Sequence, residues 1–104
     1  MKEDLLKIIE HFGVNNQQRK LQEEVFELNE AITEKKYIDN GELHEIGISK
    51  EYYWGHVCEE IADCYILLEQ FRNYYDISDK AIKHSMEIKI NRTLERIESG
   101  YYEK

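Results

Sequence analysis

Apolar residues recur at three- and four-residue spacing along most of the chain, a pattern that predicts four helices. The expected ranges are about Lys2–Phe12, Asn15–Lys36, Glu51–Tyr74 and Ser78–Ser99. Residues 37–50 lose this periodicity and predict a loop with at most one short helical turn. The chain contains no proline, and no alternating strand pattern is long enough to compete. The expected fold class is therefore all-α, a helical bundle of about four helices.

Residues at the expected helix ends fit this division. Gly13 ends the first helix, and Asn15 is the expected cap of the second, with Gln18 completing a variant of the capping box. Ser78 is the expected cap of the fourth helix, and Gly100 ends it. With no linker, repeat or low-complexity segment between the helices, residues 1–104 are expected to form a single domain.

Charge narrows the classes of function. The formal net charge is −8, which argues against binding to duplex nucleic acid or to an anionic membrane. The sequence has no apolar run of the roughly 18 residues that suggest a membrane span, and its charged start does not lead into a signal-peptide core. Cys58 and Cys64 cannot bridge within one helix and are expected to be reduced thiols. We therefore expect a cytoplasmic protein.

Each of the two long central helices carries a pair of carboxylates beside its apolar face. When the third helix is projected at about 100° per residue, Glu60 falls inside the apolar arc and Asp63 just beyond it. On the second helix, Glu24 lies at the flank of the apolar stripe and Glu27 one step further round. The apolar arc of the third helix consists of Trp54, Val57, Ile61, Cys64, Tyr65, Leu68 and Phe71.

Four carboxylates at a packed helix face must protonate, find cations or bind metal, because an uncompensated buried charge is very costly. A hard divalent cation with oxygen ligands fits them best. Magnesium would keep several waters and leave positions for phosphate oxygens, and manganese can replace it. Glutamates at this spacing are also common on solvated helices, so the residues by themselves leave a metal site and a charged helix margin open.

The segments Lys20-Leu-Gln-Glu-Glu-Val-Phe-Glu-Leu-Asn-Glu-Ala-Ile32 and Glu59-Glu-Ile-Ala-Asp-Cys-Tyr-Ile-Leu-Leu68 resemble the MazG family of all-α nucleoside triphosphate pyrophosphohydrolases. In that family, Glu-x-x-Glu on one helix and Glu-x-x-Asp on the next bind magnesium. The resemblance assigns Glu24 and Glu27 to the first motif, and Glu60 and Asp63 to the second. It implies hydrolysis of a nucleoside triphosphate to the monophosphate and pyrophosphate, with Glu24 or Glu27 as general base.

Two features depart from the family pattern. The stretch between the acidic motifs is longer than is common, and Phe26 stands where a small residue is frequent. Neither removes a metal ligand. Both bear on which nucleotide is accepted.

A basic cluster on the last helix is a candidate for phosphate binding. Lys89, Arg92 and Arg96 project within an arc of about 60°. Basic residues near a helix C-terminus are also favoured by the helix dipole, and only the resemblance favours phosphate. For the base, the aromatic side chains around the loop are candidates for stacking, with Trp54 expected to pack in the core. They are Tyr37, Tyr52, Tyr53 and Trp54.

A chain this small, with one helix that is apolar nearly all round, is expected to associate with copies of itself. The resemblance implies a homodimer or homotetramer. A di-iron bundle is set aside because the sequence contains no Glu-x-x-His. The main rival is a non-catalytic helical module whose acidic face binds a partner or only metal.

Overall fold

A computed structural model describes residues 1–41 and 49–103, and these ranges are helical with no strand. The helices are α1 (Lys2–Phe12), α2 (Val14–Asp39), α3 (Lys50–Tyr74) and α4 (Asp79–Glu98), which confirms the all-α prediction. α2 continues past its predicted end at Lys36. Most of the expected loop, and any helical turn at 42–48, lies outside the described residues. Among the described helices, none is both long and apolar enough to cross a membrane.

The chain divides into two compact units, Met1–Tyr74 and Tyr75–Lys104. The first contains α1, α2 and α3, and the second contains α4. The expectation that residues 1–104 form a single domain stays a prediction. The two carboxylate pairs both belong to the first unit, so the candidate metal site is contained within it.

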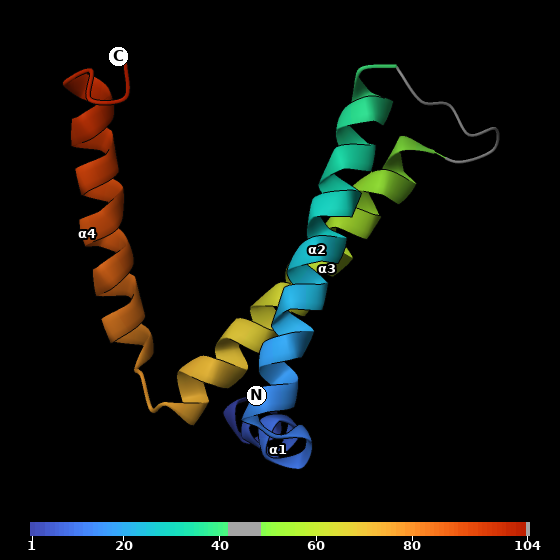
Figure 1. Ribbon diagram of the computed structural model, residues 1–104, viewed down its shortest axis with the longest axis vertical. Coiled ribbons are helices and arrows are strands. Elements are labelled where there is room, and N and C mark those ends of the chain that lie inside the picture. The colour runs from blue at the N-terminus through green and yellow to red at the C-terminus, as the bar shows by residue number, and fades with distance from the viewer. Residues whose placement is uncertain (42–48, 104) are drawn as a thin grey trace. The chain divides into compact units, whose positions relative to one another are not determined.

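In the first unit, α3 packs against both α1 and α2, and α1 also contacts α2. Figure 1 shows α2 and α3 side by side, with α1 at the end where α2 begins. The two long helices run in opposite directions, since Gln17 near the start of α2 bonds to Gln70 near the end of α3. This antiparallel pairing brings the middle of α2 against the middle of α3.

The connection between α1 and α2 is the single residue Gly13, whose φ of 88° is a conformation that favours glycine. Its N–H donates to the carbonyl of Ile9 and its carbonyl accepts from Gln17 N–H. The predicted cap at Asn15 is therefore wrong: α2 starts at Val14 with Gly13 as its N-cap, and no side chain caps it. Asn15 and Gln18 lie inside the helix.

The buried face of α3 differs from the predicted arc. Trp54 and Tyr65 are each 66% exposed and Leu68 is 52% exposed, although all three were expected to pack. The buried residues are Tyr53, Glu60, Cys64, Leu67, Gln70 and Asn73, of which the projection had placed Glu60 and Cys64 within the arc. Half of them carry amide or carboxylate side chains, so α3 turns a polar line inward, and α1 and α2 leave much of its apolar arc uncovered.

The second unit confirms both predicted ends of the last helix. Ser78 caps α4, with its hydroxyl accepting from Ala81 N–H at 3.0 Å. At the other end, Gly100 adopts a φ of 75°, Tyr101 N–H donates to the Arg96 carbonyl, and Gly100 N–H donates to the Ile97 carbonyl. These two bonds form a Schellman motif, which satisfies carbonyls left open at the helix end.

Candidate metal centre

Helical spacing and antiparallel pairing together bring the acidic motifs to one point. On α2, Glu24 shares a face with Gln17 and Ala31, each two turns away, and all three are buried. On α3, Glu60 is also buried, and Asp63 follows one turn later. Because the middles of the two helices meet, these carboxylates face one another across the helix pair.

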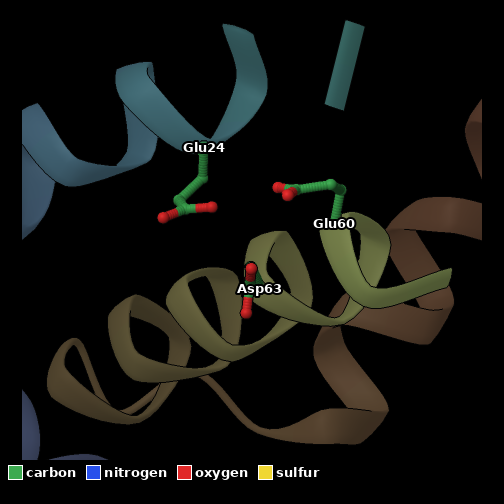
Figure 2. Close-up of side chains that lie close together, drawn as sticks. All are labelled: Glu24, Glu60 and Asp63. Atoms are coloured by element: carbon green, nitrogen blue, oxygen red, sulfur yellow. The ribbon is translucent and has the colours of Figure 1, made fainter. Parts of the chain in front are cut away.

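Glu24, Glu60 and Asp63, here called the acidic triad, offer one ligand atom each within 4.8 Å of one another. Figure 2 shows Glu24 extending from α2 toward Glu60 and Asp63, which extend from α3. Glu24 and Glu60 are 6% and 9% exposed, whereas Asp63 is exposed. The triad is therefore closed by protein on the glutamate side and open to solvent on the aspartate side.

Two oxygens of the triad lack a compensating partner. Glu24 Oε2 and Glu60 Oε2 are buried, and neither has a hydrogen-bond partner among the described residues. The other Glu24 oxygen lies 3.2 Å from Lys20 Nζ, an ion pair within α2 whose lysine is half exposed. An unpaired buried carboxylate oxygen is expensive, so the arrangement favours a cation between the helices.

The charge of the site acts on Glu60 itself. Burial raises the pKa of the Glu60 carboxyl above its ordinary range, and the nearby charges of Glu27, Glu24 and Asp63 raise it further. Three neighbouring carboxylates thus oppose ionisation of the fourth. A divalent cation would reverse that effect, because it favours the charged form of every carboxylate around it.

The donor set fits magnesium. Three carboxylates supply hard oxygen ligands, and the exposed side at Asp63 leaves room for the waters that magnesium retains. The residue after Asp63, Cys64, is a buried cysteine. Burial raises the pKa of its thiol, and the charge of Glu24 adds to the effect. The ligand atoms that meet at the triad are all carboxylate oxygens and Cys64 is not among them, a donor set that suits magnesium better than zinc.

A pocket of about 490 Å³ adjoins the triad and is formed by α1, α2 and α3. Glu24 and Asp63 contribute to its wall, together with the cations Arg19 and Lys20. Phe12, Ile66 and Leu67 are among its apolar lining residues, and Gln17 and Gln70 are among its polar ones. The two cations stand beside three carboxylates, since Glu23 also lines the wall, so an anionic ligand would contact Arg19 and Lys20 but would need a bound cation to offset the carboxylates.

The predicted site residues divide into two groups. The structure brings together Glu24, Glu60 and Asp63, while Glu27 is exposed and lies outside the triad, although its charge acts on Glu60. Lys89 and Arg92 are exposed on α4 in the second unit, and the Arg96 guanidinium lies over the Tyr101 ring at 4.8 Å. Phosphate binding by these three basic residues stays a prediction.

Sequence reasoning missed the pocket residues. Lys20 precedes Glu24 by four positions, a spacing that marks an ion pair on a helix, and this signal was available. Gln17 precedes Glu24 by two turns, and Gln70 follows Asp63 by the same interval, but nothing local indicates that two polar amides lie buried. The predicted stacking aromatics are absent from the residues that line this pocket.

Comparison of the chain with protein-family models, with curated proteins and with solved structures finds no match. The resemblance to the MazG family therefore depends on the acidic motifs, and the function must be argued from the site.

Proposed function

We propose that the chain is a magnesium-dependent, MazG-like hydrolase that converts a nucleoside triphosphate to the monophosphate and pyrophosphate.

 The substrate class comprises deoxynucleotides and modified nucleotides. The observation that carries the proposal is the acidic triad, whose three ligand atoms lie within 4.8 Å and whose two buried oxygens lack partners. These residues occupy three of the four positions at which the sequence resembles the family's magnesium motifs. Sequence pattern and geometry thus support one site.

The acidic triad and the two cations of the adjoining pocket have separate roles in this proposal. Glu24, Glu60 and Asp63 would hold magnesium, with manganese able to replace it. When bound, the ion supplies positive charge that offsets the phosphate chain and favours ionisation of water. Lys20 and Arg19 line the adjoining pocket and add positive charge on the side from which a triphosphate would enter.

We assign the general base to Glu27 rather than Glu24. Glu24 is buried and paired with Lys20, whereas Glu27 is exposed, one turn further along α2, and outside the triad. In this scheme Glu27 takes a proton from water as the water oxygen bonds to the α-phosphorus. The bond from that phosphorus to the bridging oxygen breaks, and pyrophosphate leaves with the bonding pair.

The proposal also assigns roles to the basic residues of the second unit and to self-association. Lys89, Arg92 and Arg96 would contact the β- and γ-phosphates, arginine in bidentate fashion. The uncovered apolar residues of α3, including Trp54 and Tyr65, would pack in a homodimer or homotetramer. Such an enzyme would act in the cytoplasm on free nucleotides, without duplex nucleic acid or membrane as partner.

The test is release of pyrophosphate and monophosphate from a panel of canonical and modified nucleoside triphosphates with magnesium. Glu60→Gln should reduce turnover by more than about 100-fold, beyond the loss that removal of an outer-shell partner causes. Glu59→Gln is the matched control, because it makes the same chemical change at the neighbouring, exposed position. It should retain wild-type turnover.

Two results would contradict the proposal. Equal losses in Glu60→Gln and Glu59→Gln would separate activity from the triad. A folded protein that leaves every nucleotide intact, yet melts at a higher temperature with magnesium, would favour the non-catalytic metal-binding module instead.

A further inference from the structure

Within the pocket beside the acidic triad, two buried glutamines face each other across α2 and α3. Gln17 Nε2 donates to Gln70 Oε1 at 2.8 Å. Gln70 is 2% exposed and Gln17 is 7% exposed, yet both contribute to the pocket wall. A hydrogen-bonded pair of amides is an uncommon use of buried space in a unit whose apolar core is small.

The pair lies at a defined distance from the proposed chemistry. Gln17 is seven residues before Glu24, and Gln70 is seven residues after Asp63, which places both amides about 10 Å along the helices from the triad. The pocket extends over both positions and is flanked by the apolar side chains of Phe12 and Ile66. Its length therefore suits a nucleoside with its phosphates at the triad.

We infer that this pocket holds the nucleobase, and that the Gln17–Gln70 pair reads the base's hydrogen-bonding edge. The inference rests on the proposed function, because it requires the triphosphate to bind at the triad. The base, joined to the phosphates through the sugar, then lies further along the pocket. The apolar residues contact the faces of the base, and the amides supply its polar contacts. Small-molecule sites usually combine apolar surface with placed polar groups, and Phe12 and Ile66 beside the two amides supply that combination.

The mutual hydrogen bond leaves donors and an acceptor of the two amides available for a ligand. Each glutamine side chain offers two N–H donors and one carbonyl acceptor, and their mutual bond uses one donor and one acceptor. The pair can still present a donor and an acceptor together, as the edge of every base requires. Reversing both amides keeps the mutual bond and exchanges donor for acceptor, so the polarity is set by the base that binds.

The first experiment uses the wild-type protein and does not require hydrolysis. Side-chain amide signals are followed by NMR while nucleoside monophosphates of the five common bases are added in turn. The signals of Gln17 and Gln70 should shift with a size that depends on the base, while those of exposed Gln22 stay in place. Unmoved signals for the buried pair with every base would overturn the inference.

The second experiment removes the pair without leaving an unpaired amide. Replacing both hydrogen-bonding partners by apolar groups of similar shape is far less damaging than replacing one, so the double variant Gln17→Met/Gln70→Met is used. The ratio of kcat/KM between the best and worst nucleotides should fall at least about tenfold. Gln18→Met/Gln22→Met, at two exposed positions of α2, is the matched control and should keep the wild-type ratio.

These results separate the two proposals. An unchanged preference among bases in the buried double variant, with turnover intact, would overturn base reading and leave the pyrophosphohydrolase proposal standing. Base-dependent NMR shifts without turnover of any triphosphate would contradict the proposed enzyme and support the base site. Thermal melting of both double variants shows that the comparison is made on folded protein.

Discussion

Lys20 Nζ lies 3.2 Å from Glu24 Oε1, so a lysine neutralises one oxygen of a carboxylate that we assign to magnesium. The pairing raises the pKa of Lys20, which keeps the lysine charged. Lys20→Met should lower the stability of the metal-free protein by up to about 1 kcal/mol, because the lysine is half exposed. It should also raise magnesium affinity several-fold, since a competing cation is gone. Thermal melting with and without magnesium measures both effects.

Lys36→Met, at an exposed position of the same helix, controls for loss of a lysine. It should leave the magnesium-induced rise in melting temperature as it is in the wild type. A smaller rise in Lys20→Met than in Lys36→Met would show that the lysine supports metal binding and does not compete with it.

Glu60→Gln should have opposite effects on stability with and without metal. In the metal-free protein it removes a buried charge that lies among other carboxylates, so we expect stabilisation by about 1 kcal/mol. With excess magnesium the wild type gains the free energy of binding and becomes the more stable protein. Urea unfolding in chelator and in magnesium measures the reversal. A variant less stable than the wild type in chelator would mean that Glu60 has a stabilising partner in the folded chain.

The raised pKa of Glu60 predicts a pH dependence. As the pH rises above the ordinary value of 4.5, the unfolded chain loses this proton first while the folded protein retains it. The contribution of Glu60 to stability is thus complete below 4.5 and is lost as the pH rises through its higher folded pKa. In chelator, the stability difference between Glu60→Gln and the wild type should therefore grow with pH across this window. A constant difference would contradict the assignment.

The sequence predicted much of the fold because its helices are long and well separated. Ser78 and Gly100 mark the ends of α4 as expected, and α3 ends at the predicted Tyr74. The start of α2 was missed because one glycine makes the whole turn after α1, which leaves no room for a side-chain cap at Asn15.

The candidate site was predicted less completely. Spacing alone selected Glu24, Glu60 and Asp63, but it grouped Glu27 with them equally. A projection that assumes the most apolar face is buried also placed Trp54 in the core, whereas α3 buries the face that carries Glu60 and Gln70. An apolar face can be covered either by packing within the chain or by association with a second copy. The sequence pattern of an apolar face is the same in both cases.

The exposed apolar residues of α3 predict self-association. Ile61, Tyr65 and Leu68 recur at helical spacing and are 37%, 66% and 52% exposed. Leu68→Glu should dissociate the homo-oligomer, because a charge at an apolar interface is left unpaired. Sedimentation at micromolar concentration measures the mass, and Ala62→Glu, at an exposed position outside this stripe, is the control. A wild-type mass equal to the monomer would contradict self-association.

The central claim, that α2 and α3 together hold one divalent-cation site, is tested most directly by titrating metal-free protein with manganese and following the free ion by electron paramagnetic resonance. We predict saturable binding in the wild type and in Glu59→Gln, and its loss in both Glu60→Gln and Asp63→Asn. Equal manganese binding by all four proteins would contradict the claim, because the acidic triad would then make no specific contribution.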